Sequence, residues 1–254
     1  MNAETKPPAL EARALSKTFG HVEALRDVSF SAHAGEVLAI LGDNGAGKST
    51  LIKILSGVYD PDNGGVAVNG QPVVFHKPSD ATGAGVATVY QDLALVDTRD
   101  VAANIFLGRE FTKGPFIDRR RMYREARNAI DTLSLKLPSV RVPVGLLSGG
   151  QRQAVAIVRA ASQGADIIIM DEPTAALGVT ESGRVMELAA RLRDTGRAVI
   201  IISHNLQQIW PIADRFLVMR LGQVAGIPAK RDTSIDGLIR LIMYGNDTPE
   251  GALA

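Results

Sequence analysis

The sequence predicts an α/β fold with a parallel sheet, and three short apolar runs carry that prediction. They lie within Val37–Leu41, Ile167–Glu172 and Arg197–Ser203. Continuous apolar runs of this length, bounded by turn or polar residues, are typical of strands that are buried on both faces of a parallel sheet. Helical segments separate them, so residues 164–220 alternate between strand and helix. A chain of 254 residues is long enough for one large α/β domain with an inserted subdomain.

A glycine-rich loop follows the first predicted strand. Residues Gly42–Thr50 read GDNGAGKST and match the phosphate-loop pattern G-x-x-x-x-G-K-[ST]. Its glycines let successive N–H groups point toward phosphate oxygens, and a helix predicted from Lys48 to Ser56, closed by Gly57, adds the positive end of its dipole. The predicted nucleotide-binding residues here are Gly42, Asp43, Asn44, Gly45, Ala46, Gly47, Lys48, Ser49 and Thr50.

Polar side chains follow the other two predicted strands. Asp171 and Glu172 end one strand, and His204 follows the next. Ligands of open parallel sheets bind at the carboxyl ends of the strands, so we expect all three beside the phosphate loop. Lys48 should reach the β- and γ-phosphates of ATP, and Ser49 and Asp171 should ligate Mg²⁺. Glu172 is suited to orient or deprotonate the attacking water.

Leu147–Gln151 reads LSGGQ, and its Ser-Gly-Gly opens a helix predicted from Gln151 to about Ser162. With this motif the chain resembles the nucleotide-binding subunits of ABC transporters over roughly residues 10–225. The resemblance implies an ABC-type P-loop NTPase domain with an antiparallel β subdomain and an inserted helical subdomain. Gln91 matches the glutamine of the Q-loop, a ligand of the catalytic Mg²⁺. Phe19 matches the aromatic position that stacks on adenine, and His204 matches the switch histidine.

The same resemblance implies a head-to-tail homodimer of cassettes. Each ATP would be held by the phosphate loop of one copy and by a second set of residues from the other copy: Ser148, Gly149, Gly150 and Gln151. One position departs from the pattern, because Gly178 stands where most of the family carries Asp.

The organisation along the chain agrees with one cassette. We expect a single ABC ATP-binding domain over residues 9–245, with the helical subdomain at 92–163 and flexible tails at 1–8 and 246–254. Asn69-Gly70 predicts a tight hairpin, and Asp60–Gly65 a turn. Asp118 should cap a helix that places Met122, Ala126, Ile130 and Leu133 on one face. A last helix, near 234–244, should pack its stripe of Ile235, Leu238, Ile239 and Ile242 on the core.

Composition limits the function classes. The net charge is +1, which gives no general case for nucleic-acid binding, and the absence of cysteine excludes disulfides and cysteine-based zinc sites. The sequence shows no apolar run of the length that a membrane-spanning helix needs and no signal-peptide core at the start. We therefore expect a peripheral position on the cytoplasmic side of the membrane. Arg119–Arg121 invites a nucleic-acid or lipid interpretation, but a solvated helix start is favoured, with docking of the insert on a membrane partner as the alternative.

The transported substrate rests on resemblance alone. Tyr90–Val96, Ala103–Glu110 and Glu172–Gly178 are similar to ribose/fructose-type monosaccharide importers. The implied function is an ATPase subunit that powers such an importer, together with membrane-spanning permease subunits and, indirectly, a periplasmic or extracellular sugar-binding protein. The alternative is a soluble ABC ATPase that acts on DNA or the ribosome. The sequence shows neither the long heptad insertion nor the second cassette expected of those classes.

Overall fold

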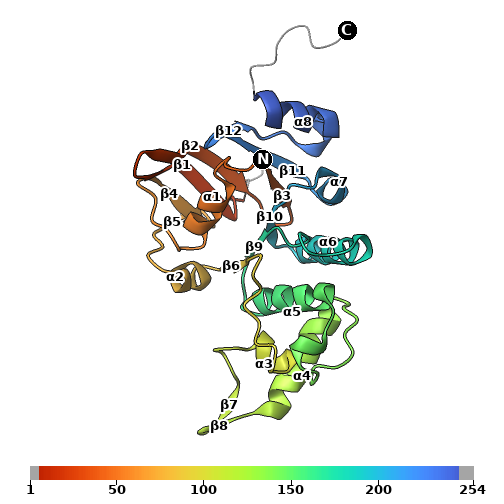
Figure 1. Ribbon diagram of the computed structural model, residues 1–254. Coiled ribbons are helices and arrows are strands. Elements are labelled where there is room, and N and C mark those ends of the chain that lie inside the picture. Colours follow the sequence, from red (N-terminus) through yellow and green to blue (C-terminus); the bar gives the residue numbers. More distant parts are fainter. Residues whose placement is uncertain (1–5, 246–254) are drawn as a thin grey trace, which may run out of the picture.

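The computed structural model describes residues 6–245, and Figure 1 shows their arrangement. Residues 1–5 and 246–254, which make up most of the two predicted tails, lie outside the described residues. Among residues 6–245, no helix is both long enough and apolar enough to cross a bilayer.

The central sheet has six strands, and five of them are parallel. Its order is β12 (Gln223–Gly226), β11 (Arg215–Arg220), β3 (Val37–Leu41), β10 (Ala198–Ile202), β9 (Ile167–Asp171) and β6 (Val86–Val89). The three strands predicted from apolar runs are β3, β10 and β9, which are adjacent. The parallel sheet is therefore confirmed, and β12 at one edge is the antiparallel exception.

A second, antiparallel sheet lies beside it and completes the predicted β subdomain. Its order is β2 (Val22–Ala32), β1 (Leu10–Phe19), β4 (Asn63–Val68) and β5 (Gln71–Val73). The hairpin at Asn69-Gly70 is confirmed, since Val68 pairs with Gln71 and both turn residues have positive φ. The turn predicted over Asp60–Gly65 is partly wrong, because β4 already begins at Asn63. Gly64 approaches the backbone of β1 so closely, at φ +84°, that a Cβ would lie 2.3 Å from the Ala14 carbonyl oxygen.

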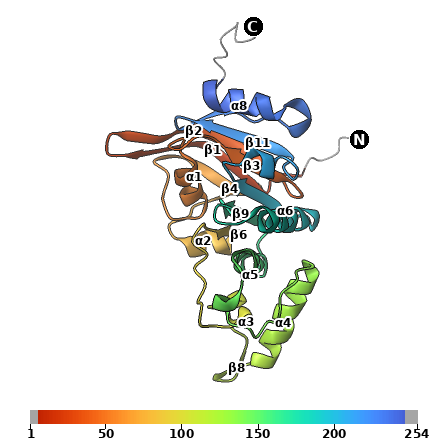
Figure 2. The ribbon, with the colours of Figure 1, turned by 45° about the vertical axis from the view of Figure 1, so that its right-hand side comes forward.

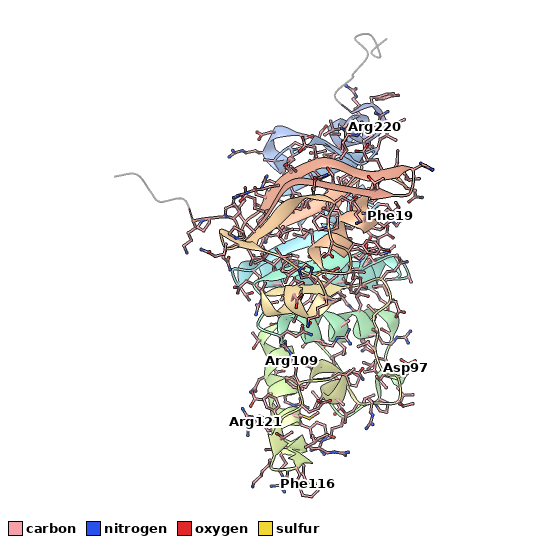
Figure 3. All side chains as sticks on the ribbon, turned by 90° about the vertical axis from the view of Figure 1, so that its left-hand side faces the viewer. Phe19, Asp97, Arg109, Phe116, Arg121 and Arg220 are labelled. Atoms are coloured by element: carbon pink, nitrogen blue, oxygen red, sulfur yellow. The ribbon has the colours of Figure 1, made fainter. Side chains whose placement is uncertain are left out.

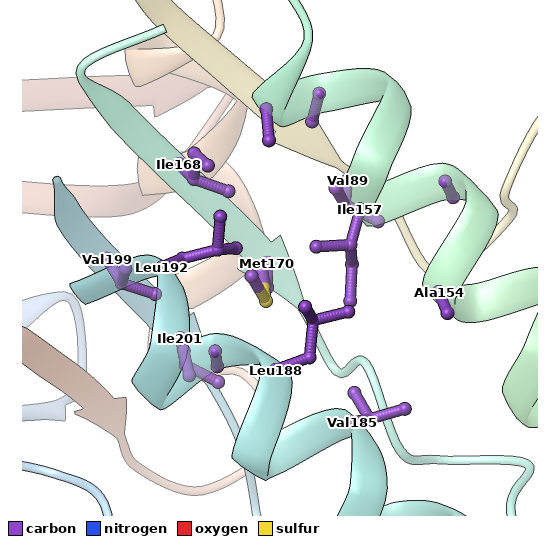
Figure 4. Close-up of a cluster of buried hydrophobic side chains, with 14 of the residues drawn as sticks. Val89, Ala154, Ile157, Ile168, Met170, Val185, Leu188, Leu192, Val199 and Ile201 are labelled. Atoms are coloured by element: carbon purple, nitrogen blue, oxygen red, sulfur yellow. The ribbon is translucent and has the colours of Figure 1, made fainter. Parts of the chain in front are cut away.

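The helices cover both faces of the central sheet. In chain order they are α1 (Lys48–Leu55), α2 (Pro78–Gly83), α3 (Val101–Ile105), α4 (Arg119–Thr132), α5 (Gly149–Ala161), α6 (Val179–Asp194), α7 (Leu206–Ile209) and α8 (Ile235–Tyr244), with 3-10 turns η1 (Val144–Leu146) and η2 (Lys230–Asp232). Successive strand residues alternate between two cores, as the pleat of a doubly covered sheet requires. Ile168, Met170, Val199 and Ile201 face α5 and α6 (Figure 4), whereas Ile167, Ile169 and Ile200 face α1 and the antiparallel sheet.

The segment between β6 and β9 carries α3 and α4 away from the two sheets, as Figure 2 shows, whereas its α5 packs on the central sheet. Asp118 caps α4 by accepting a hydrogen bond from the Arg121 N–H at 3.0 Å, and Met122, Ala126 and Ile130 are buried as predicted. The segment is not wholly helical, which corrects the prediction. A two-stranded hairpin, β7 (Thr112–Lys113) and β8 (Phe116–Ile117), precedes α4.

The last helix, α8, is capped by Ser234 and buries Leu238 completely. Leu238, Leu241 and Ile242 pack on the core, but the side chain of Ile239 is exposed, so its predicted place in the core is wrong. At 100° per residue, Ile239 is turned away from the stripe formed by its neighbours at 238, 241 and 242.

Two glycines, one inside α6 and one just after it, predict opposite effects of the same substitution. Gly183 lies in the helix interior with open space around its Cβ position, whereas Gly196 lies just after the helix at φ +89°. Gly183→Ala should raise the free energy of unfolding by about 1 kcal/mol, because alanine loses less backbone entropy in a helix. Gly196→Ala should lower it by roughly 1 kcal/mol through strain. Urea unfolding measures both, and equal effects of the two changes would contradict this assignment.

Candidate functional site

The parallel register brings the three predicted motifs to one edge of the central sheet. Ile202 of β10 pairs with Ile40 of β3 on one side and with Asp171 of β9 on the other. All three strands therefore end at the same level. The phosphate loop follows β3, Glu172 follows β9 and His204 follows β10. The expected juxtaposition of these segments is found, although each lies in a different part of the chain.

The phosphate loop adopts the backbone that its glycines were expected to allow. Gly42, Gly45 and Gly47 all have positive φ. A Cβ on Gly42 would lie 2.3 Å from the Met219 carbonyl oxygen, so only glycine fits there. Helix α1 begins at Lys48 without a side-chain cap on its N-terminus. Its first N–H groups thus remain available for an anion, as in a phosphate-binding loop.

Lys48 lies inside the loop rather than in solvent. Its Nζ donates hydrogen bonds to the carbonyl oxygens of Gly42 at 2.7 Å and Asp43 at 2.8 Å, and the residue is 9% exposed. Burial lowers the pKa of Lys48, while the charges of Glu172, Asp43 and Asp171 oppose that shift. The ammonium group is therefore the local positive charge of a site in which three carboxylates lie nearby.

The two carboxylates at the end of β9, Asp171 and Glu172, are both partly buried. Burial raises the pKa of Asp171, the charge of Glu172 adds to this, and Lys48 and Lys53 oppose it. Glu172 Oε1 lies 3.2 Å from His204 Nδ1. Glu172 also has φ +44°, which is rare outside glycine, and its N–H donates to the Ile202 carbonyl oxygen at 3.0 Å. The backbone of Glu172 is thus held in a conformation that costs energy, and its side chain contacts His204.

The residues predicted to hold a metal offer oxygen atoms only. Ser49 offers a hydroxyl oxygen, Gln91 an amide oxygen and Asp171 a carboxylate oxygen. This set of ligands suits a hard cation such as Mg²⁺. In the described part of the chain, no group of three or more His, Cys, Asp or Glu residues could hold a metal by itself. Gln91 and Glu172 line one cavity of about 360 Å³.

The LSGGQ segment forms the N-terminus of α5, slightly earlier than predicted. Ser148 and Gln151 build a reciprocal capping box: Ser148 Oγ accepts from the Gln151 N–H at 3.4 Å, and Gln151 Oε1 accepts from the Ser148 N–H at 3.0 Å. Gly149 lines the same cavity as Gln91 and Glu172. Ser148 and Gly150 line a different cavity, between α5 and α6. Residues 42–50 line neither of these two cavities. The segment therefore borders two separate cavities, and one of them also carries Glu172.

Phe19 ends β1 with 42% of its surface exposed. Its ring meets the edge of Tyr59 at 5.3 Å between centroids, and Lys17 Nζ lies 5.7 Å from its centre. An exposed aromatic face supported from one side is suited to stack on a flat ligand. Tyr59 is a residue that sequence reasoning missed, because nothing in its local pattern links it to position 19.

Arg159 is a second missed residue. From α5 its guanidinium donates to the carbonyl oxygens of Leu93 at 2.7 Å and Ala94 at 2.9 Å, and burial lowers its pKa. Ala94 has φ +47°, so this side chain holds the loop after Gln91 in a strained shape and ties it to the LSGGQ helix. An arginine within an otherwise apolar stretch of the helix was the only sequence signal for it.

A model of the ABC transporter family matches residues 25–175. The chain belongs to the ABC transporter family. A xylose/arabinose import ATP-binding protein of Sulfolobus acidocaldarius is 45% identical, over 92% of this chain and 93% of that protein. A fructose import ATP-binding protein of Rhizobium meliloti is 42% identical, over 97% and 98%. A ribose import ATP-binding protein of Yersinia pestis is 39% identical over 94% of this chain but only 47% of its own length.

Solved structures agree with this membership of the ABC family. A nucleotide-free ATP-binding cassette from an ABC transporter superposes with a TM-score of 0.79 at 27% identity, covering 88% of this chain and 92% of that one. Another ABC cassette, solved in its ADP conformation, gives 0.80 at 25% identity, covering 93% and 95%. The predicted ABC-type fold with its two subdomains is thereby confirmed.

The exposed ring of Phe19 predicts a graded response to substitution. If Phe19 stacks on adenine, Phe19→Ala should weaken ATP binding several-fold, since an aromatic face contributes on the order of 1 kcal/mol, while Phe19→Tyr should bind as the parent does. Isothermal titration of ATP measures all three. Equal affinities would mean that Phe19 only packs against Tyr59.

Proposed function

We propose that this chain binds and hydrolyses ATP and that the hydrolysis powers import of a monosaccharide through a membrane permease. Its membership of the ABC transporter family supports the ATPase, and the relatives named for xylose/arabinose, fructose and ribose import support the substrate class. The observation that carries the chemistry is the Glu172–His204 pair, 3.2 Å apart beside Lys48 at the carboxyl edge of the sheet.

Each residue of this edge has a proposed role. The free N–H groups of residues 42–50 and the Lys48 ammonium bind the phosphates. Ser49, Gln91 and Asp171 hold Mg²⁺, which when bound offsets the charge of the phosphate oxygens. Glu172 orients the attacking water and accepts its proton, and His204 contacts the γ-phosphate from the neighbouring strand. Phe19 stacks on adenine.

The assembly that we propose is a head-to-tail homodimer. Ser148, Gly149, Gly150 and Gln151 of one copy would face the ATP held by the phosphate loop of the other. Support comes from membership of the ABC transporter family and from the LSGGQ motif at the N-terminus of α5, where Ser148 is exposed. Gly178 is compatible with this arrangement, because it is exposed at the N-terminus of α6 and its Cβ position is open.

The remaining partners are proposed on the same basis. Permease subunits would anchor the homodimer at the cytoplasmic face of the membrane, and a sugar-binding protein outside would deliver the substrate. The single cassette over 9–245, with residues 92–163 as its helical insert, would then be one of two identical ATPase subunits. Nucleic acid has no place in this proposal, in keeping with the net charge of +1.

The test of the chemistry is Glu172→Gln, which keeps the shape of the side chain and removes the base. ATP binding should remain, and ATP turnover should fall about a hundredfold or more. Glu125→Gln is the matched control, since it makes the same change on α4, where the ion pair of Glu125 is with the adjacent Arg124, and it should leave turnover unchanged. Near-normal turnover in a Glu172→Gln protein that still binds ATP would refute the assignment.

A further inference from the structure

The segment between α1 and β4 contacts the end of β1 that carries Phe19. The ring of Phe19 lies at the surface beside the antiparallel sheet (Figure 3). The last pair of β1 with β4 joins Ser16 and Asn63, so residues 17–19 run past the start of β4. The pairing of β1 with β2 also shifts its register on either side of Lys17. Regular sheet pairing alone therefore does not set the direction of Phe19.

Asp62 holds this strand end at the point where β4 is about to begin. Its Oδ2 accepts a hydrogen bond from the Thr18 N–H at 2.7 Å, and its own N–H donates to the Ser16 carbonyl oxygen at 2.8 Å. Its Oδ1 lies 2.7 Å from Lys17 Nζ. The hydrogen bonds to the carboxylate, that from Lys17 first, hold the pKa of Asp62 below its ordinary value, so it is ionised at neutral pH. Asp62 thus takes the place of a strand partner for Thr18.

Tyr59 supports the ring of Phe19 from the same segment. The two ring centroids are 5.3 Å apart and the ring planes meet at 63°, an edge-to-face contact. The Tyr59 N–H donates to the carbonyl oxygen of Lys53 in α1 at 3.0 Å. The Tyr59 side chain packs against the core that α1 shares with the antiparallel sheet. The support for Phe19 is therefore attached to the helix whose N-terminus follows the phosphate loop.

We propose that Asp62 and Tyr59 are positioning residues for the contact of Phe19 with adenine. Asp62 fixes the backbone of the strand end, and Tyr59 fixes the ring. Their attachment to α1 keeps the ring at a constant place relative to the phosphate loop. Ordering a mobile side chain on binding costs free energy, and a ring that is already held in the free protein avoids this cost. The proposal rests on the proposed function, in which Phe19 stacks on adenine.

The hydrogen bond from Thr18 carries more of this effect than the ion pair with Lys17. The side chain of Asp62 is 40% exposed, and ion pairs in contact with water contribute little. The backbone bond, by contrast, acts directly on the residue before Phe19. Asp62→Asn keeps an oxygen that can accept from the Thr18 N–H and removes the charge, so it should behave nearly as the parent does. Asp62→Ala removes both interactions.

The experiment compares the binding of MgATP with that of magnesium tripolyphosphate, which carries phosphates and no base, by isothermal titration. Asp62→Ala and Tyr59→Leu should each weaken ATP binding roughly two- to tenfold, the range of an aromatic contact, and leave tripolyphosphate binding unchanged. In a Phe19→Ala background neither change should weaken ATP binding further, because the ring through which both act is gone. Turnover of Asp62→Ala at saturating ATP should equal that of the parent, while its KM for ATP rises.

Asp60→Ala is the matched control, because it removes a second carboxylate from the same turn. Among the described residues, the carboxylate of Asp60 pairs with His76, 3.4 Å away, and this variant should bind ATP as the parent does. Equal losses for ATP and tripolyphosphate, or a further loss in the Phe19→Ala background, would overturn the proposal. A loss in Asp62→Asn as large as that in Asp62→Ala would overturn the role of the Thr18 hydrogen bond.

The binding of ATP by the parent separates this proposal from the function on which it rests. A parent that neither binds nor hydrolyses ATP refutes the proposed ATPase. A parent that binds ATP no more tightly than tripolyphosphate refutes the stacking of Phe19 itself. Parent-like ATP binding by both Asp62→Ala and Tyr59→Leu, in a protein whose Phe19→Ala variant binds ATP weakly, refutes the positioning role alone.

Discussion

The site depends above all on the common register of three parallel strands. β3, β10 and β9 end together, with Ile40, Ile202 and Asp171 side by side, and each strand delivers one part of the chemistry. A slip of one residue would exchange the faces of every side chain beyond it. The alternation of strand residues between two fully buried cores prevents such a slip, because either face of the slipped strand would misplace large aliphatic groups.

That register also explains the charge balance at the edge. A buried ammonium group is costly unless carboxylates or carbonyl oxygens compensate it. Lys48 has both, from the Gly42 and Asp43 carbonyls and from the nearby charges of Asp171 and Glu172. The positive φ of Glu172 is part of the same arrangement, since the hydrogen bond from its N–H to Ile202 holds the chain in that conformation.

The sequence predicted this edge well because apolar runs and glycine patterns are local signals. Val37–Leu41 is a strand to the residue, and the phosphate loop, Glu172 and His204 meet as expected. What it missed depends on contacts between distant segments. Arg159 matters only through the carbonyls of Leu93 and Ala94, and the strands of the hairpin at 112–117 are two residues each, too short for an alternating pattern. The exposure of Ile239 follows from the exact rotation of α8, which a stripe of apolar residues does not determine.

The central claim is that one chain holds half of each ATP site, and the oligomeric state tests it most directly. Light scattering of Glu172→Gln at high protein concentration should show a dimer with ATP and a monomer with ADP, since Ser148 and the amides of Gly149 and Gly150 would reach the γ-phosphate. Adding Ser148→Arg should abolish the dimer and leave ATP binding to the monomer intact. A dimer that forms without regard to nucleotide, or that survives Ser148→Arg, would contradict the claim that LSGGQ acts on the partner's ATP.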